Sequence, residues 1–171
     1  MRAILLLAVL AFAPDAALAD FTGRVVKVAD GDTLTVLLDR KHVRVRLDGI
    51  DAPEWDQAYG KQSRRSLAQL CSAKEARVAE RGKDRYGHTL GVVTCAAVEA
   101  NSEQVRRGMA WAFKGYVPMG SALYELETYA RLRKIGLWAD ASPVAPWDWR
   151  EAQQAKARKK KAASTKRPEP K

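Results

Sequence analysis

Cysteine and histidine are scarce in this 171-residue chain, which has two residues of each type. No C-x-x-C pair occurs and His42 lies far from His88 in sequence, so the pattern does not support a zinc or thiol-redox site. Two cysteines are too few for a disulfide-dense scaffold, and 11 Gly and 7 Pro exclude a collagen-like chain. Cys71 and Cys95 are either paired or two buried thiols, and pairing is favoured if the chain folds in an oxidising compartment.

Long apolar runs are equally rare, and the clearest is Ile4–Ala13, which follows Arg2 and precedes Pro14. About ten apolar residues are too few to cross roughly 30 Å of hydrocarbon. A buried helix is the alternative, but the basic start, the apolar run and the small-x-small ending at Ala19 are typical of a signal peptide. We therefore expect residues 1–19 to be a signal peptide cleaved near Ala19. The mature protein is then expected to be secreted or periplasmic, without membrane insertion.

Negative charge is in deficit, with 20 Asp and Glu against 30 Lys and Arg and a formal net charge of +10. Such an excess favours an anionic partner, which could be nucleic acid, an anionic membrane surface or another polyanion. Residues 151–171 have no apolar side chain larger than Ala and are strongly basic. We expect a disordered basic tail there, although the composition tolerates a helix as far as Lys161. The tail either aids solubility or attracts polyanions without specificity.

The body of the chain, residues 20–150, is expected to form one domain. Phe21–Val28 and Thr33–Leu38 are rich in β-formers around a polar turn, and Val43–Leu47 alternates valines with Arg44 and Arg46. The two arginines should therefore share one face of a strand whose other face packs in the core. Later patterns predict a helix over 60–70, strands near 77–79 and 89–94, and helices starting at 101 and 121. Asn101 is expected to cap the helix that starts there, with Gln104 as its partner in a capping box. These elements predict a mainly antiparallel β-barrel with helices packed on it.

Five short motifs occur in a fixed order within this domain, and each alone is a weak signal. They read Asp30-Gly31-Asp32-Thr33, RLDGIDAPE over residues 46–54, Asp84-Arg85-Tyr86-Gly87, Gly108-Met109-Ala110 and Gly136-Leu137-Trp138. In this order and spacing the chain resembles the thermonuclease (staphylococcal nuclease-like) family from Phe21 to about Asp140. The resemblance implies an α+β, mainly β fold, namely a five-stranded OB-fold barrel with about three helices packed on it. It also implies a Ca²⁺-dependent phosphodiesterase that cleaves DNA and RNA.

The chemistry of phosphodiester hydrolysis requires cations beside the phosphate and a group that handles the attacking water. Asp32 and Asp51 lie at strand ends, and two carboxylates with water and backbone carbonyls suit Ca²⁺. The resemblance makes these two residues Ca²⁺ ligands, together with the backbone carbonyl of Ala52. It makes Glu54 the glutamate that takes a proton from water or positions it. It makes Arg46 the guanidinium that holds the scissile phosphate through two charge-assisted hydrogen bonds.

One departure from the family pattern is His88, because a second arginine usually follows the Asp-Arg/Lys-Tyr-Gly motif. Losing one transition-state donor typically lowers a rate by roughly 10²–10³-fold. Three alternatives stay open: His88 acts as a general acid, a neighbour such as Arg81, Lys83 or Arg85 substitutes, or the enzyme is weak.

Aromatic residues complete the candidate set. Tyr86 and Tyr116 resemble the family tyrosines beside the nucleotide, and Arg85 is a further candidate for substrate binding; ordinary packing is an equal alternative for Tyr116. Trp55 stays open between packing and function, whereas packing is expected for the other four: Trp111, Trp138, Trp147 and Trp149.

The predicted function is therefore a secreted Ca²⁺-dependent nuclease with little sequence specificity, expected to be a monomer. Two alternatives from other classes are a catalytically weakened OB-fold module that binds nucleic acid, and a basic secreted protein that binds envelope polyanions. The retained acids Asp32, Asp51 and Glu54 favour the enzyme, because binding alone would gain from losing negative charge beside phosphate.

Overall fold

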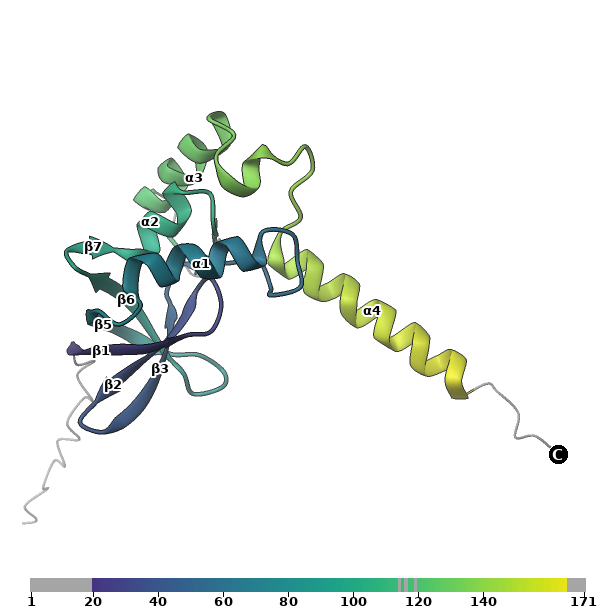
Figure 1. Ribbon diagram of the computed structural model, residues 1–171. Coiled ribbons are helices and arrows are strands. Elements are labelled where there is room, and N and C mark those ends of the chain that lie inside the picture. Colours follow the sequence, from purple (N-terminus) through teal and green to yellow (C-terminus); the bar gives the residue numbers. More distant parts are fainter. Residues whose placement is uncertain (1–19, 114, 116, 119, 166–171) are drawn as a thin grey trace, which may run out of the picture.

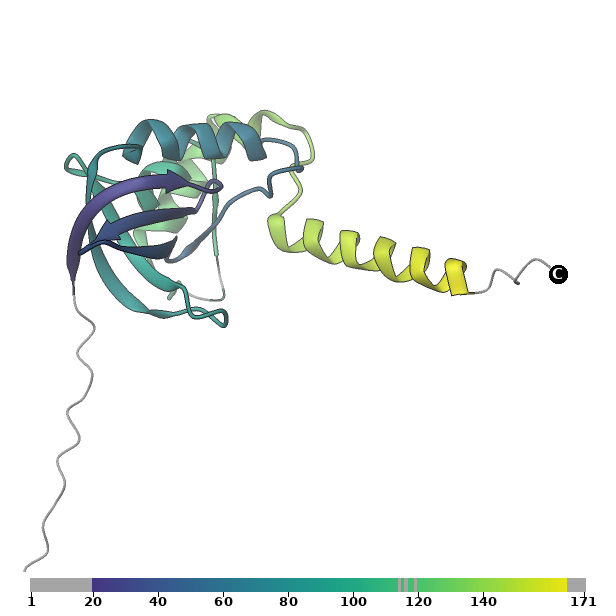
Figure 2. The same ribbon diagram turned by 60° about the horizontal axis from the view of Figure 1, so that its bottom comes forward.

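The computed structural model describes residues 20–113, 115, 117–118 and 120–165 (Figure 1). The signal peptide expected at residues 1–19, Tyr116 and residues 166–171 of the expected tail lie outside this part of the chain. The described residues form a β-barrel with helices on one side, and one further helix extends away from the barrel (Figures 1 and 2).

Five strands build the barrel: β1 (Phe21–Val28), β2 (Thr33–Leu38), β3 (Lys41–Leu47), β5 (Glu75–Lys83) and β6 (Thr89–Cys95). They are ordered β3-β2-β1-β5-β6, with antiparallel neighbours, and the barrel closes through a parallel pairing of β3 with β6. The short strand β7 (Val98–Glu99) extends the sheet beside β6. The predicted α+β, mainly β fold with a five-stranded OB-fold barrel is thus confirmed.

Alternating side chains explain why these strands enclose a core. Along β6 every second residue is buried, and four valines of other strands fill the same interior: Val25, Val36, Val45 and Val78. β5 is nine residues long, whereas the sequence predicted a short strand over 77–79. Because β5 pairs with β1 on one side and β6 on the other, its ladder continues through polar residues that local hydrophobicity does not mark.

A second, two-stranded sheet lies next to the barrel. It pairs β4 (Ile50–Asp51) with β8 (Trp111–Ala112) in antiparallel fashion, and Asp51 lies opposite Trp111. All four of these residues are buried. This small sheet therefore fixes the backbone of Asp51 shortly after the chain has left β3.

Helix α1 (Gly60–Cys71) lies across the barrel strands (Figure 2), with Leu67, Leu70 and Cys71 buried. A disulfide joins Cys71 to Cys95 of β6, whose Cα atoms are 5.3 Å apart. The structure therefore has the pairing that was favoured over two buried thiols, and it ties the end of α1 to the barrel.

The N-cap predicted for helix α2 (Ala100–Arg106) is wrong. Its N-cap is Glu99, and the expected cap Asn101 is a buried residue inside the helix. The Asn101 side chain accepts a hydrogen bond from the Val93 backbone and donates to the carbonyl of Asp48. Buried partners on the barrel, rather than the helix terminus, thus satisfy this amide.

The remaining elements are α3 (Ala122–Leu132), the 3-10 helix η1 (Gly136–Ala139) and α4 (Pro146–Thr165). Ser121 caps α3, because its side chain accepts a hydrogen bond from the Leu123 backbone at 3.3 Å. Three helices, α1, α2 and α3, thus lie with the barrel, in agreement with the expected number, and α4 is a fourth.

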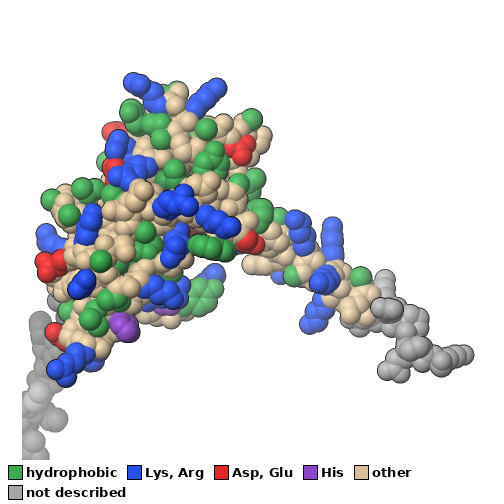
Figure 3. Space-filling view, viewed as in Figure 1, with side chains coloured by type: hydrophobic (Ala, Val, Ile, Leu, Met, Phe, Trp, Pro, Cys, Tyr) green, Lys and Arg blue, Asp and Glu red, His purple; other side chains and the backbone are tan. Residues whose placement is uncertain are grey.

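The structure continues α4 to Thr165, so residues 151–165 form the helix that was the alternative as far as Lys161, and not the expected disordered tail. Ala, Gln, Lys and Arg all have favourable helix propensities, so the segment forms a helix although it has no core of its own. It extends away from the barrel in both ribbon views, and Figure 3 shows Lys and Arg side chains along it. Among the described helices, none has the length and apolar character that crossing a membrane requires.

Candidate active site

A cavity of about 480 Å³ lies against the barrel. Its lining includes residues from β3, from the segments after β3 and β4, from the turn between β5 and β6, and from the start of α4. Six residues singled out from the sequence line it: Arg46, Asp51, Glu54, Arg85, Tyr86 and His88. The structure therefore gathers in one place most of the residues that the resemblance assigned to catalysis and substrate binding.

Asp32 lies behind this cavity, in the turn between β1 and β2, and is 3% exposed. Its Oδ2 accepts a hydrogen bond from the backbone N–H of Ala52 at 2.9 Å, and its Oδ1 accepts one from Thr33 Oγ1 at 2.8 Å. Burial raises the pKa of Asp32 to about 7, although the charge of Arg46 acts in the opposite direction. The carboxylate is therefore held in place, and any further positive charge nearby would stabilise its ionised form.

The turn that carries Asp32 depends on Gly31. A Cβ atom at position 31 would collide with the side chain of Ser63 on α1 and with Cβ of Ala52. Gln104 of α2 donates a hydrogen bond to the Gly31 carbonyl at 2.6 Å. Gln104, expected in a capping box, is thus a buried support for this turn, and glycine permits the close approach.

Arg46 and Asp51 form the centre of the site. Arg46 Nη2 lies 2.8 Å from Asp51 Oδ1 and 3.3 Å from Asp32 Oδ2, so one guanidinium bridges the two acids expected as metal ligands. Burial acts to lower the pKa of Arg46, but the charges of Asp32 and Asp51 outweigh it and raise that pKa. Arg46 faces the cavity because it alternates with Val45 and Leu47, which are buried in the barrel.

Arg150, in the first turns of α4, is the site residue that sequence reasoning missed. Its Nη1 lies 2.7 Å from Glu54 Oε1 and 3.2 Å from Asp51 Oδ1, and its Nη2 lies 2.7 Å from Asp51 Oδ2. Hydrogen bonding to Asp51 raises the pKa of Arg150, with a further contribution from Glu54, and outweighs desolvation. Arg150 is therefore a charged neighbour of two of the predicted site acids.

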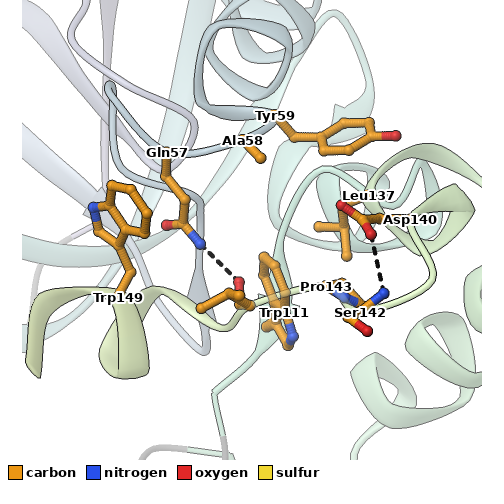
Figure 4. A pocket seen from close by; sticks show the side chains of 10 residues that line it. Gln57, Ala58, Tyr59, Trp111, Leu137, Asp140, Ser142, Pro143 and Trp149 are labelled. Atoms are coloured by element: carbon orange, nitrogen blue, oxygen red, sulfur yellow. Dashed lines mark hydrogen bonds between the residues drawn. The ribbon is translucent and has the colours of Figure 1, made fainter. Parts of the chain in front are cut away.

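Glu54 lies in the loop that follows β4, and about 40% of its side chain is exposed. Gln57 organises this loop: its Oε1 accepts a hydrogen bond from the Glu54 backbone at 3.1 Å, and its Nε2 donates to the Val144 carbonyl at 2.7 Å. Figure 4 shows Gln57 reaching toward the segment before α4, beside Trp149. One amide side chain thus connects the Glu54 loop to the segment that leads to Arg150.

Aromatic packing also holds the beginning of α4 in place. The ring of Trp147 lies 6.5 Å from that of Trp111 and 5.6 Å from that of Phe113, measured between centroids. Trp111 also stacks edge-on against Trp138 at 5.1 Å. Trp111, Trp138 and Trp147 are therefore packing residues as expected, and the packing of Trp147 positions Arg150. The signal for this in the sequence is the apolar and aromatic stretch over 144–149, directly ahead of the polar tail.

His88 is oriented by Asp84 at the other edge of the cavity. Its Nδ1 lies 2.9 Å from Asp84 Oδ2, and its backbone N–H donates to Asp84 Oδ1 at 2.9 Å. Desolvation acts to raise the pKa of Asp84, but the hydrogen bonds from His88 and from the Tyr86 backbone lower it overall. The carboxylate therefore stays ionised and fixes the imidazole at the cavity wall.

The three neighbours considered as substitutes for an arginine at position 88 differ in where they point. Arg85 lines the cavity and lies 4.9 Å from the centroid of the Tyr86 ring, which is 68% exposed. Lys83 bonds to Glu80 and Thr89, and Arg81 lines a different hollow beside α2. The structure thus brings Arg85 to the cavity but not the other two.

Asp32, Asp51 and the backbone of Ala52 are the candidates to hold a metal ion. Within the described residues, no group of three or more His, Cys, Asp or Glu side chains is suited to this. Two carboxylates nevertheless converge on a single nitrogen of Arg46. Such oxygen donors, completed by backbone oxygens and water, are the ligands that a hard cation such as Ca²⁺ takes, so the donor set fits that ion.

Two further candidates remain, Trp55 and Tyr116. Trp55, which the sequence left open, is 53% exposed and is contacted by Lys61 and Arg64 of α1, with the charged groups 5.9 and 5.5 Å from its ring centroid. Tyr116 is outside the described residues, so its expected role beside the nucleotide stays a prediction.

Comparison with known proteins agrees with this arrangement. Residues 44–140 match the family described as "Staphylococcal nuclease homologue". The chain is 44% identical over 144 residues to a protein named "Micrococcal nuclease" from Shigella flexneri, covering 78% of this chain and 83% of the relative. It is 48% identical over 130 residues to an "Uncharacterized endonuclease" from Haemophilus influenzae, covering 75% and 72%. A "Staphylococcal-like nuclease CAN1" from Arabidopsis thaliana is 34% identical over 111 residues, covering 65% of this chain and 34% of the plant protein. The chain therefore belongs to the staphylococcal nuclease homologue family and is a nuclease, a hydrolase of nucleic acid.

Proposed function

We propose that this nuclease hydrolyses phosphodiester bonds of both DNA and RNA in a Ca²⁺-dependent reaction with little sequence specificity. The observation that carries the proposal is the convergence of Arg46, Asp51 and Glu54 on one open cavity. These groups supply the two things that phosphodiester hydrolysis needs from a protein, namely positive charge for the phosphoryl oxygens and a carboxylate for the attacking water.

Each side chain has a distinct part in the proposed reaction. Arg46 donates hydrogen bonds to the oxygens of the scissile phosphate, whose negative charge increases as the bond to water forms. Glu54 orients the attacking water and accepts its proton while the water oxygen bonds to phosphorus. The phosphorus–oxygen bond on the far side breaks, and the leaving oxygen takes a proton from His88 or from solvent.

A divalent cation belongs to the same proposal. Asp32, Asp51 and the backbone carbonyl of Ala52 would hold it, and when bound it supplies positive charge that neutralises the phosphoryl oxygens. The raised pKa of Asp32 supports this, because a buried carboxylate short of positive charge is stabilised in its ionised form by a cation.

The proposed breadth of substrate rests on the side chains that line the cavity. Among the residues that line it, Arg85 can contact phosphates and the exposed ring of Tyr86 can stack on any base. The basic residues of α4 add attraction that depends on charge alone. Binding of this kind treats DNA and RNA alike, because phosphate contacts do not distinguish bases.

Export of the protein is proposed on separate grounds. The N-terminal pattern of a basic residue, an apolar run and a small-x-small ending supports a signal peptide. The disulfide between Cys71 and Cys95 supports folding in an oxidising compartment, outside the cytoplasm.

The alternative of a module that only binds nucleic acid is not favoured. Asp51 and Glu54 face the same cavity as the arginines, where their negative charge opposes phosphate binding. Carboxylates in this position are useful for catalysis and unfavourable for binding alone. The same argument applies to a protein that merely adheres to envelope polyanions.

The test uses single-stranded DNA and RNA of the same sequence, incubated with the purified protein in Ca²⁺ or in chelator. We expect cleavage of both substrates in Ca²⁺ and none in chelator. Glu54→Gln should lower the cleavage rate about 10²–10⁴-fold, the usual contribution of a positioned acid–base group. Cleavage that persists both in chelator and in Glu54→Gln contradicts the proposal, and cleavage of DNA alone restricts it.

A further inference from the structure

We propose that Arg150 is a second phosphate-binding arginine of this active site, delivered to it by the first turns of α4. The inference rests on the proposed phosphodiesterase function and adds to it a residue from outside the barrel. Arg150 would bind the scissile phosphate together with Arg46 and stabilise the charge that develops on it during hydrolysis.

The first support is the position of the two guanidinium groups. Arg46 bonds to Asp51 Oδ1 at 2.8 Å, and Arg150 bonds to Asp51 Oδ2 at 2.7 Å. The two cations therefore meet on one carboxylate. A phosphate group presents its oxygens at a spacing similar to that of a carboxylate, so two guanidiniums that share Asp51 can also share one phosphate.

The second support is the bonding capacity of Arg150. A guanidinium has five N–H donors, and the contacts to Asp51 and Glu54 involve three donor–acceptor pairs. About 36% of the side chain is exposed, and Arg150 lines the cavity. It can therefore donate to a phosphate in the cavity while it still holds the carboxylate of Glu54 in place.

The third support is the composition of the cavity wall. Five acidic residues line it: Asp30, Asp48, Asp51, Glu54 and Asp84. A polyanionic substrate can approach such a wall only if cations offset the acids. Four arginines line the same cavity, namely Arg44, Arg46, Arg85 and Arg150, and of these Arg150 is the one that contacts Glu54. His88 offers an imidazole already bonded to Asp84, so it presents no planar fork of donors to a phosphate. Arg150 supplies such a fork, next to Glu54.

The last support is that the position of Arg150 is prepared before substrate arrives. Gln57 ties the segment before α4 to the Glu54 loop, and Trp147 packs against Trp111 and Phe113. A cation fixed in this way needs little reorganisation when charge develops on the phosphate. The rest of α4 extends into solvent, so its contact with the catalytic domain is concentrated around the turn that bears Arg150.

The same contacts suggest an opposite role, in which Arg150 blocks the site by occupying Asp51. The two roles predict effects of opposite sign. If Arg150 binds phosphate, its removal slows cleavage. If it blocks the site, its removal speeds cleavage and lowers the Ca²⁺ concentration needed for half-maximal rate.

The experiment compares Arg150→Gln and Arg150→Lys with Arg133→Gln, which removes an exposed arginine directly after α3 and outside the cavity lining. Thermal melting first establishes that each variant is folded, and kcat and KM are then measured on single-stranded DNA over a Ca²⁺ titration. We expect kcat/KM to fall about 10²-fold in Arg150→Gln. Arg150→Lys should recover only part of this loss because a point charge cannot form the fork, and Arg133→Gln should match the parent protein.

Two further measurements separate a direct contact from an indirect one. Binding of a fluorescent single-stranded DNA in chelator, where no cleavage is expected, should weaken several-fold in Arg150→Gln. Adding His88→Arg to Arg150→Gln should restore at least tenfold in kcat/KM, because the new guanidinium enters the same cavity from its other edge.

Unchanged kcat/KM in Arg150→Gln, with Ca²⁺-dependent cleavage intact, overturns this inference and leaves the proposed function standing. A faster variant with a lower Ca²⁺ requirement also overturns it, in favour of the blocking role. Should Arg150→Gln fail to fold, Arg150→Lys decides the question. A lysine variant equal to the parent protein overturns the inference, and one slowed tenfold or more supports it.

Discussion

The proposed active site combines two regions that hold their side chains in different ways. Asp32, Arg46 and Asp51 belong to the barrel and the small sheet beside it, where strand pairing and burial fix them. Arg150 belongs to a helix that is attached near its first turn and otherwise extends into solvent. The global fold therefore positions Asp32, Arg46 and Asp51, whereas the position of Arg150 depends on a local docking contact.

The largest effect should come from removing the crosslink of the barrel region. The double variant Cys71→Ala/Cys95→Ala opens a loop with a sequence separation of 24 residues, and loop entropy predicts a loss of about 3 kcal/mol in the free energy of unfolding. Urea titration measures this loss, and the cleavage rate at low temperature should stay close to that of the parent protein. A variant equally stable to urea, or one that is folded yet inactive, contradicts the view that the bridge supports the barrel without shaping the site.

A smaller effect, which falls on the cleavage rate more than on stability, is expected at the start of α4. Trp147→Ala removes the ring that packs against Trp111 and Phe113, so the first turn of α4 loses its fixed position. We expect kcat/KM to fall about tenfold, on the scale by which misplacing a positioned group lowers a rate, while the free energy of unfolding changes less than in the disulfide variant.

Two controls accompany this prediction. Tyr129→Ala removes an exposed ring on α3, outside the cavity, and should leave the rate unchanged. Combining Trp147→Ala with Arg150→Gln should cost little more than Arg150→Gln alone, because both act through the same guanidinium. If the fold-losses in kcat/KM of the two single variants multiply in the double variant, Trp147 does not act through Arg150.

The smallest effect concerns Glu103 of α2, which forms ion pairs with Arg106 and Arg107 and does not line the cavity. Hydrogen bonding from Arg106, opposed by desolvation and aided by Arg107, lowers the pKa of Glu103 to about 2 from its ordinary 4.5. An acid whose pKa is depressed by folding stabilises the fold above its ordinary pKa and loses this contribution as the pH falls toward the lowered value.

Glu103→Gln should therefore cost about 1 kcal/mol of unfolding free energy at pH 7, a modest value because both arginines are partly exposed. The gap between variant and parent should close as the pH falls from about 4.5 to about 2. Urea unfolding at pH 7, 4 and 2.5 measures it, and the cleavage rate at pH 7 should not change. A gap of the same size at pH 2.5 contradicts the assignment.

The same division between regions explains how much the sequence could predict. Phe21–Val28 and Thr33–Leu38 match the strands of the structure because their β-former content and the polar turn between them are local signals. Alternation along Val43–Leu47 is another local signal, and it placed Arg46 correctly on the outer face of its strand. Asp51 and Glu54 were found through a motif that is contiguous in sequence. The fold then brings Asp51 into contact with Arg46, and Glu54 to the same cavity.

The errors arose where a side chain depends on partners far away in the sequence. Asn101 was read as a helix cap, but its partners are backbone groups of the barrel, which no local pattern reveals. Arg150 meets Asp51 and Glu54 across 99 and 96 residues, and it stands at the edge of a segment that composition marks as solvated. The helix over 151–165 was considered only as far as Lys161 and only as the alternative to a disordered tail, because its stability comes from intrinsic propensity rather than from a core.

The alternation along β3 also limits how this enzyme can vary. Arg46 lies opposite Thr33 in the β2–β3 ladder, and its neighbour Val45 is completely buried. Shifting the register by one residue exchanges the two faces of a strand, so Val45 would enter the cavity and Arg46 the apolar interior. Substitutions can adjust the chemistry one side chain at a time, whereas a single inserted or deleted residue in this hairpin would remove catalysis and folding together.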